Sequence, residues 1–270
     1  MTEYLLREYR REDIPCLIEL WHRVFGDPES LISEFLVRLP SFGTGAVAEY
    51  RGKAVGAAYA IDDMYIHDSL GRERRCGYIY AVAVSPEHRH QGLGEALSQR
   101  AAELSRRRGS RFLCTLPAEE ALYPWYEKIL GLGCALHRRC FSSAASPLLP
   151  CRELEADEYL SRREKLLEGR PHMRPGRELM DFAAFFYRSF GGGLYLCGGG
   201  ICAAYGDKEL VIKELLVPDC ILPGETAASL AAFLGREEAR YYLPSPDGEM
   251  YISAQEGELP ADLIWNLSFD

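Results

Sequence analysis

Residues 82–97 combine features that could bind an anion. The apolar run 78–84 (YIYAVAV) is typical of a strand buried on both faces. A turn containing Pro86 follows, and Gly92 and Gly94 lie where a long helix over 92–108 is expected to begin. Glycines let a ligand approach the backbone, and the free N–H groups of a first helical turn attract negative charge. The segment therefore predicts an anion site that would suit a pyrophosphate.

A second segment, residues 121–132 (ALYPWYEKILGL), places Trp125 and Tyr126 on a helix expected over 119–130. Taken alone, such aromatic residues are usually part of a core. Together with the first segment, they resemble the GNAT superfamily of N-acetyltransferases. The shared features are Arg89-x-x-Gly92-x-Gly94 between a strand and a helix, then Trp125-Tyr126 and the variant ending 129–132 (ILGL). Neither a Rossmann fingerprint nor a Walker loop fits, because the third glycine and the Lys-Ser/Thr pair are missing.

The resemblance covers about residues 78–132 by motif and roughly 1–142 by the order of elements. It implies an α/β fold with a mixed sheet and acetyl-CoA as the acyl donor. The main chain of Val82 and Val84 would pair with the pantetheine arm, and amides from His90 to Glu95 would hold the pyrophosphate. The full cofactor-binding set that it implies is Val82, Ala83, Val84, Arg89, His90, Gln91, Gly92, Leu93, Gly94 and Glu95.

The resemblance also implies that Tyr126 protonates the departing CoA thiolate. An ordinary tyrosine pKa of ~10 lies above that of a thiol, ~8.5, so a tyrosine is a reasonable acid for sulfur. A backbone N–H near Val82–Val84 could stabilise the oxyanion of the tetrahedral intermediate. Attack by the amine is direct in this superfamily, so none of the nine cysteines is needed as a nucleophile.

The general base stays open. Many relatives carry an acidic residue on the strand before the phosphate loop, where this chain has Tyr78 and Tyr80. A chain of water molecules is one alternative. The others, by position alone, are Asp62, Asp63, Glu29, Glu34 and the C-terminal carboxylate of Asp270, which would follow a last strand over 264–269.

The chain is expected to divide at a proline-punctuated linker, residues 143–150. Residues 1–142 predict a catalytic domain with the order β-α-α-β-β-β-α-β-α-β. Residues 151–270 predict a degenerate copy, which resembles the enhanced-intracellular-survival type without its third domain. Its expected elements are helices 155–168 and 178–190, strands 194–197, 201–205 and 210–217, helix 226–234 and strand 239–243. Arg188, Gly191 and Gly193 repeat the loop spacing there, but a helix precedes them and a strand follows, which indicates a chance match.

Charge and composition limit the class of partner. Residues 1–150 hold 19 Lys+Arg and 19 Asp+Glu, so the whole net charge of −9 lies in residues 151–270 (31 − 19 = 12 basic, 40 − 19 = 21 acidic). This balance argues against nucleic acid, and no apolar run approaches the ~20 residues of a membrane span. We expect a small-molecule or peptide amine as acceptor, and the acidic half favours a cation. A homo-oligomer is compatible with the sequence.

The nine cysteines show no zinc-type spacing, so we expect free thiols in a reducing cytoplasm and no metal. A rival interpretation of the whole chain is a non-catalytic acyl-CoA-binding sensor or regulatory module, which would retain the phosphate loop but lack a competent base.

Overall fold

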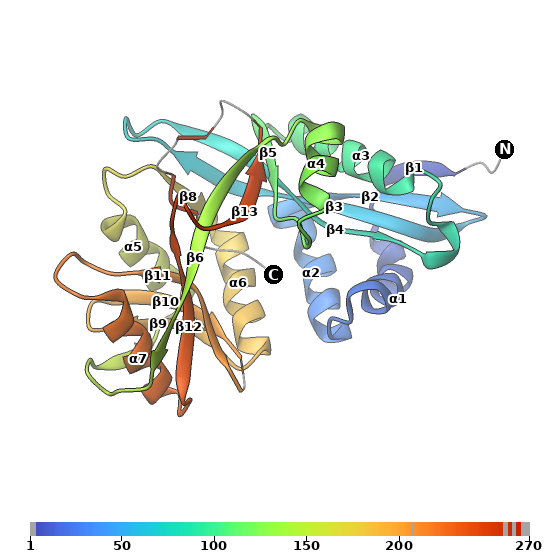
Figure 1. Cartoon of the computed structure of the whole chain (residues 1–270). Coiled ribbons are helices and arrows are strands. Elements are labelled where there is room, and N and C mark those ends of the chain that lie inside the picture. Colours follow the sequence, from blue (N-terminus) through green and yellow to red (C-terminus); the bar gives the residue numbers. More distant parts are fainter. Residues whose placement is uncertain (1–3, 207, 256–258, 261–262, 266–270) are drawn as a thin grey trace. The chain divides into compact units, whose positions relative to one another are not determined.

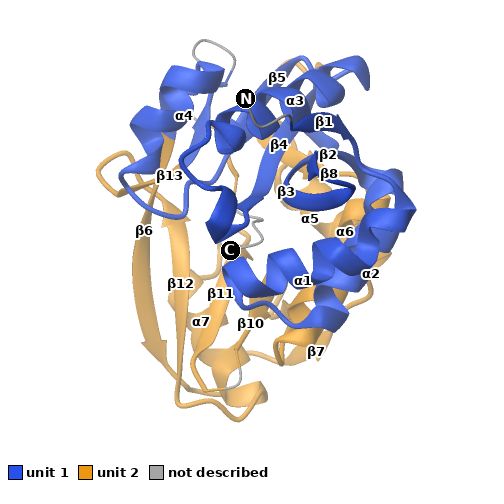
Figure 2. Ribbon diagram, turned by 90° about the vertical axis from the view of Figure 1, so that its right-hand side faces the viewer, with its two compact units in different colours: residues 1–66, 73–135, 252–260 blue, residues 67–72, 136–251, 261–270 orange. Residues whose placement is uncertain are grey.

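A computed structural model of the chain describes residues 4–206, 208–255, 259–260 and 263–265. It divides into two compact units, which Figure 2 colours separately. Unit 1 contains residues 1–66, 73–135 and 252–260, and unit 2 contains residues 67–72, 136–251 and 261–270. The sequence predicted a division at 143–150. The structure divides the chain after residue 135 instead and assigns residues 252–260, close to the C-terminus, to unit 1.

Unit 1 is built on a mixed sheet with the strand order β1-β2-β3-β4-β5-β13 (Figure 1). Its strands are β1 (Leu5–Glu8), β2 (Gly43–Tyr50), β3 (Lys53–His67), β4 (Glu73–Val84), β5 (Phe112–Thr115) and the end of β13 (Glu249–Ala254). β1 and β2 pair antiparallel, as do β2 and β3, whereas β4 and β5 pair parallel. This is the mixed α/β fold that the sequence predicts.

Helices cover both faces of this sheet. The helices of unit 1 are α1 (Ile14–Phe25), α2 (Glu29–Phe42), α3 (Leu93–Arg107) and α4 (Leu122–Leu130), with short 3-10 turns η1 (Arg11–Asp13) and η2 (Pro86–His88). Successive side chains of β3 point to opposite faces of the sheet and show which helices cover each face. Ala58 and Ala60 face the core under α3 and α4, whereas the ring of Tyr59 lies 5.2 Å from that of Trp21 on α1.

The strands of unit 2 follow the order β6-β12-β11-β10-β9-β7. Its elements are β6 (Cys134–Ala144), β7 (Cys151–Glu153), α5 (Ala156–Leu166), β8 (His172–Pro175), α6 (Arg177–Ser189), β9 (Gly193–Cys197), β10 (Gly200–Tyr205), β11 (Leu210–Leu216), α7 (Pro223–Phe233) and β12 (Glu238–Pro244). The helices and strands expected over 155–243 all form, each within a few residues of its expected bounds. Residues 266–269 of the last strand expected over 264–269 lie outside the described residues. The short strands β7 and β8 were not expected, because too few residues carry the period-2 pattern.

The order of elements in unit 1 repeats in unit 2. A strand, two helices, three strands, a helix and a strand occur in each, with the short strand β8 added between the two helices of unit 2. In each unit the parallel pair joins the third of the three strands to the last strand (β4–β5 and β11–β12). The strand beside that pair comes from elsewhere in the chain. β13, which follows unit 2 in sequence, pairs with β5, and β6, which follows α4, pairs with β12.

The cysteines correct one expectation. Cys151 on β7 lies opposite Cys197 on β9, with 4.2 Å between the Cα atoms, and the two form a disulfide. The expectation of free thiols throughout is therefore wrong for this pair. The two cysteines are 46 residues apart in sequence, so their spacing does not indicate that they lie opposite each other on neighbouring strands. The other seven cysteines are free.

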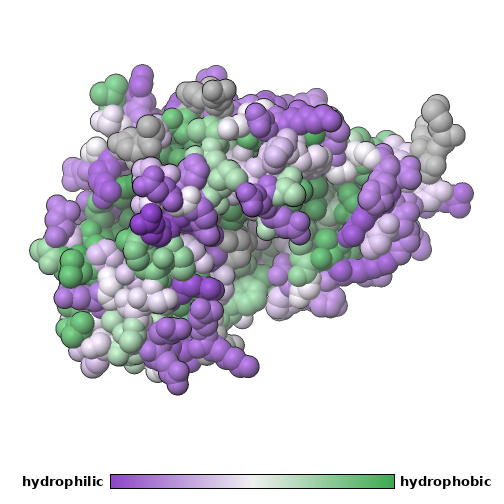
Figure 3. Space-filling view, viewed as in Figure 1, coloured by the Kyte–Doolittle hydropathy of each residue, from purple (hydrophilic) through white to green (hydrophobic). Residues whose placement is uncertain are grey.

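Within the described part of the chain, no helix is both long enough and apolar enough to cross a bilayer. On the face seen in Figure 3, hydrophilic and hydrophobic side chains are interspersed.

A buried ion pair links α5 to the sheet of unit 2. The Arg163 guanidinium donates from Nε to Glu214 at 3.1 Å, and both side chains are fully buried. The hydroxyl of Tyr159, also fully buried, donates to the same carboxylate at 2.9 Å. A buried charge without its partner is expensive, so each member of this network depends on the others.

We expect Glu214→Ala to destabilise the chain by about 3–5 kcal/mol, because it leaves the Arg163 charge buried and unpaired. Replacing all three groups together (Tyr159→Phe, Arg163→Met, Glu214→Leu) should recover most of that loss, since no buried charge remains. Urea denaturation of the full chain, followed by circular dichroism, measures both. A near-wild-type midpoint for Glu214→Ala would contradict the assignment.

Candidate functional site

Strands β4 and β5 separate within unit 1. Their parallel pairing runs from Cys76–Phe112 to Ile79–Thr115 and stops there, while β4 continues through residues 80–84. Beyond Ile79, β5 therefore no longer occupies the adjacent edge of β4. We call this divergence the fork. A backbone edge of this kind can accept an extended ligand as an added strand.

Ala81 marks the change in β4. Its φ is +47°, in the left-handed region that a residue with a side chain rarely adopts. Such strain persists only where the surrounding structure enforces it, and it is concentrated at functional positions. Past it, Val82 and Val84 pack against the core that α3 and α4 share, and Ala83 is buried.

The turn after β4 is held by contacts to other elements. Glu87 forms an ion pair with Arg23 on α1 and accepts a hydrogen bond from Ser85 at 2.5 Å; these contacts lower the pKa of Glu87 to about 2. The ring of His88 lies 5.1 Å from that of Tyr50, and its Nδ1 is 3.1 Å from the hydroxyl oxygen of Tyr4. The turn is therefore positioned before any ligand arrives.

Helix α3 begins without a capping side chain. Gly92 is its N-cap, with φ +75° and no side-chain hydrogen bond to the first turn. A Cβ at Gly92 would meet nothing within 4 Å, and one at Gly94 would meet only the indole of Trp125 at 3.8 Å. The N–H groups at the start of the helix are therefore available to an anion, in open space and at the positive end of the dipole.

The residues of the loop differ in what they can offer a ligand. His90, with φ +59°, and Gln91 are exposed, and so is Glu95, which accepts a hydrogen bond from Gln99. Leu93 is 5% exposed and its side chain belongs to the core, so only its amide is available. Arg89 donates from Nε to the carbonyl oxygen of Val84 at 3.2 Å, which folds the turn back onto the end of β4.

Tyr126 lies at the fork. Its hydroxyl is hydrogen-bonded to that of Thr115, which in turn donates to the carbonyl oxygen of Ile79 at 2.8 Å. The bond therefore ties α4 to the last paired residues of β4 and β5.

Burial raises the pKa of Tyr126, and the contact with Thr115 partly opposes that rise. The side chain is 7% exposed, and its ring lies 4.8 Å from that of Trp125, edge to face. The phenol is therefore protonated at neutral pH, which is the state that a proton donor requires.

The expected candidates for a general base are mostly engaged elsewhere. Asp62 is fully buried and 2.6 Å from Arg108, which follows the last turn of α3; burial raises the pKa of this carboxyl, and Arg108 opposes the rise. Since α3 has 15 residues, it spans about 22 Å, which separates Arg108 from the phosphate loop. The structure therefore places Asp62 in an ion pair at the other end of α3.

The remaining candidates differ in their surroundings. The rings of Tyr78 and Tyr80 stack 5.8 Å apart, and that of Tyr80 also lies 5.5 Å from Phe35. Glu34 pairs with Arg38, as neighbours one turn apart on α2. Asp63 lies 3.4 Å from the hydroxyl of Tyr65, Glu29 is exposed at the start of α2, and Asp270 lies outside the described residues.

The equivalent position in unit 2 is closed. Helix α7 follows β11 as α3 follows β4, but it begins with Pro223, which has no N–H. A Cβ at Gly224 would lie 3.2 Å from the Ser143 hydroxyl and 3.4 Å from that of Tyr241, so the space is already occupied. Arg188, in the other spacing match, is paired with Glu153 at 2.9 Å. Neither place offers an open helix start like the one at Gly92.

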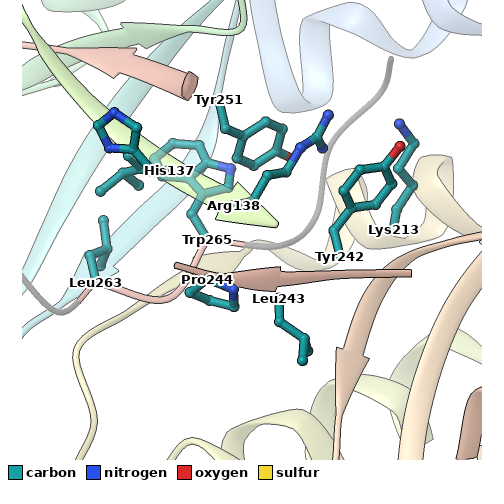
Figure 4. Close-up of a pocket in the computed structure, with 10 residues that line it drawn as sticks. His137, Arg138, Lys213, Tyr242, Leu243, Pro244, Tyr251, Leu263 and Trp265 are labelled. Carbon is teal, nitrogen blue, oxygen red and sulfur yellow. The ribbon is translucent and has the colours of Figure 1, made fainter. Parts of the chain in front are cut away.

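A small pocket lies within unit 2, lined by residues of β6, the middle of β11 and the end of β12 (Figure 4). Arg138 is stacked between the rings of Tyr251 and Tyr242, at 3.9 and 4.1 Å from their centroids. Lys213, 5% exposed, also lines it. These cations would repel an amine, so this pocket does not fit the expected acceptor.

Sequence reasoning missed three contributors to the site: Ala81, Thr115 and the Arg23–Glu87 tether. Thr115 had a readable signal, because it is a polar residue at the end of an otherwise apolar strand (FLCT). The other two depend on backbone geometry and on long-range contacts, which spacing along the chain does not reveal.

Comparison with known proteins agrees with this geometry. Residues 5–132 match the model of the acetyltransferase (GNAT) family. A search of curated proteins returned no match.

Several solved structures resemble nearly the whole chain, among them the following three. A GCN5-related N-acetyltransferase from Kribbella flavida has a TM-score of 0.62 at 19% identity, covering 93% of this chain and 71% of its own. Eis1 from Mycobacterium abscessus has a TM-score of 0.61 at 12% identity, covering 93% and 73%. A GCN5-related N-acetyltransferase from Anabaena variabilis has a TM-score of 0.60 at 14% identity, covering 94% and 71%.

At such low identities the likeness to these structures establishes the fold alone. The match to the family model shows which part of the chain is similar to the family. The matched range contains the fork, the uncapped start of α3 and Tyr126. Residues 5–132 of this chain belong to the acetyltransferase (GNAT) family.

Proposed function

We propose that unit 1 is an acetyl-CoA-dependent N-acetyltransferase, which moves the acetyl group to an amine by direct attack in a ternary complex. The observation that carries the proposal is the fork. At one point of the sheet it combines an edge of β4 that β5 leaves uncovered, a buried phenol bonded to Thr115, and a nearby helix start without a capping side chain.

Acetyl-CoA, the acyl donor, would lie in one orientation along this site. Its pyrophosphate would lie on the amides from His90 to Glu95, over the open space at Gly92 and Gly94. The pantetheine arm would then run along β4, bonded to the main chain of Val82 and Val84, toward the fork. This places the thioester near Tyr126, where the two strands part.

The chemistry then needs few groups. The amine nitrogen attacks the thioester carbonyl carbon, and a backbone N–H near Val82–Val84 stabilises the resulting oxyanion. As the C–S bond breaks, the phenol of Tyr126 gives its proton to the sulfur, so that CoA leaves as a thiol. A water molecule takes the proton lost by the amine, since the described carboxylates named above are paired or lie away from the fork.

The acceptor that we propose is a small-molecule or peptide amine. The excess of acidic residues over 151–270 would attract cationic molecules to the protein. We further propose that unit 2 is a degenerate copy that binds no CoA of its own, because Pro223 and the filled space at Gly224 remove the cradle.

A non-catalytic acyl-CoA sensor is the second candidate. The observation that favours it is the pair Tyr78 and Tyr80, which stands on β4 where an acidic base would be convenient. Such a protein would bind CoA through the same cradle but would release no thiol with any amine.

The cradle is tested by placing a charge at Gly94, where a side chain fits without backbone strain. We expect Gly94→Asp to weaken CoA binding at least tenfold, since like charges ~4 Å apart near a protein surface repel by about 4 kcal/mol. Isothermal calorimetry with CoA measures this. Gly94→Asn has the same shape without the charge, and Gly94→Ala tests bulk alone; both should bind more tightly than Gly94→Asp. Equal affinities for Asp and Asn would show that no phosphate lies there.

The acid is tested by Tyr126→Phe, which removes one oxygen atom from a well-packed site. We expect kcat to fall by about 10²–10⁴-fold with CoA affinity unchanged, because the phenol acts only as the C–S bond breaks. The measurement is thiol release from acetyl-CoA with a panel of amines. Tyr123→Phe, on the same helix, is the matched control and should retain wild-type kcat. A Tyr126→Phe enzyme as fast as wild type would eliminate the acid role, and a wild type that releases no thiol with any amine would favour the sensor.

A further inference from the structure

Three side chains that can bind a metal ion converge within unit 2. His67 ends β3, Glu164 lies on the last turn of α5, and His172 begins β8. Each offers one ligand atom, and these atoms all lie within 4.8 Å of one another. His172 is 5% exposed and the other two are half-buried, so the cluster is shielded from solvent on one side.

The protonation of His172 is fixed by its neighbours. Its Nδ1 lies 2.7 Å from the carbonyl oxygen of Arg170, and a carbonyl can only accept, so Nδ1 carries a proton. Its Nε2 lies 3.3 Å from a carboxylate oxygen of Glu164. Two lone pairs cannot face each other at that distance without a positive charge between them. Either a second proton or a metal ion must bridge Nε2 and Glu164.

A second proton would make an imidazolium–carboxylate ion pair. A bound metal ion would make an arrangement that is common in metalloproteins. Histidines that bind metals almost always donate their other ring N–H to a carbonyl or carboxylate, which orients the ring and fixes the tautomer. The bond from His172 to Arg170 has that form. The ring of His67, 5.1 Å from that of His172 between centroids, supplies the third ligand.

The surrounding charges leave Glu164 able to bind a cation. Glu164 is half-buried, and one of its carboxylate oxygens lies 3.3 Å from Nε2 of His172. Arg163 is 3.5 Å from Glu164, yet its charge is already balanced by the buried carboxylate of Glu214. Arg174 also acts on Glu164 and would moderate the affinity.

We propose that His67, Glu164 and His172 form a binding site for a divalent transition-metal ion, with Zn²⁺ as the best fit and water as the fourth ligand. Two imidazoles and one carboxylate suit Zn²⁺, Co²⁺ or Ni²⁺ and not the all-oxygen sites of Mg²⁺ or Ca²⁺. Tetrahedral bonds of about 2.0 Å hold ligand atoms about 3.3 Å apart. The most distant pair therefore needs to close by at most about 1.5 Å, which rotation of the half-buried side chains can provide.

This site departs from the expectation of no metal. Its ligands are 97 residues apart (164 − 67) and then 8 apart (172 − 164), so no short spacing motif exists to find. Bound metal would join the turn 67–72 to α5 and β8, three segments of the same unit. The site is independent of the acetyltransferase proposal, because none of its residues belongs to the fork or the cradle.

The test is a titration of the metal-free full chain with Co²⁺, followed by visible absorption. We expect a single equivalent to give the intense bands of a tetrahedral ion without a thiolate charge-transfer band, and Zn²⁺ to displace it. Glu164→Gln and His67→Ala should each weaken the affinity at least about tenfold, as judged from losses seen on changing even outer-shell groups. Glu168→Gln and His22→Ala, at an exposed carboxylate and an exposed histidine, should bind as wild type does.

Any one of these results would overturn the proposal: no Co²⁺ binding, bands of an octahedral ion, or equal affinity in wild type and Glu164→Gln. A thiolate band would also overturn it, because it would assign the ion to one of the seven free cysteines. Glu164→Gln keeps an oxygen acceptor toward His172 and is expected to fold. If its circular dichroism differs from wild type, His67→Ala decides the outcome, since His67 ends a strand and is only half-buried.

Discussion

The hydrogen-bond chain from Tyr126 through Thr115 to Ile79 fixes the place where β4 and β5 part, and the rest of the site depends on that place. Parallel strands that stayed paired to their ends would leave no backbone edge for a ligand. Because the pairing stops at Ile79 and Thr115, the backbone past it is available, while the bond from α4 keeps the fork from opening further. A buried polar chain of this kind is stable only when each donor finds its acceptor.

The same part of the fold differs between the two units. Both units pair a third strand parallel to a last strand, with a helix between them. In unit 1 that helix starts at glycines over open space, whereas in unit 2 it starts at Pro223 with side chains against Gly224. A few residues at one helix start therefore separate an open start with free N–H groups from a packed one.

Local signals carried most of what could be predicted. The apolar run before Pro86 and the glycines after it predicted strand, turn and helix over 78–108, and the structure has β4, η2 and α3 there. What could not be predicted is long-range. The fork needs the register of β4 against β5, the disulfide needs that of β7 against β9, and the His67 cluster needs three distant segments. Pairing between remote strands is set by tertiary packing, which residue spacing alone does not encode.

Hydrogen–deuterium exchange of the full chain, with and without CoA, tests most directly the claim that one fork in unit 1 holds the donor. We predict slower exchange at the amides of residues 80–84 and 90–95 on adding CoA, with exchange at residues 213–224 of unit 2 unchanged. Protection at 213–224 instead, or no protection at 80–84, would contradict this prediction. Protection at 213–224 would mean that CoA binds to unit 2. Lack of protection at 80–84 would mean that the fork does not take part in CoA binding.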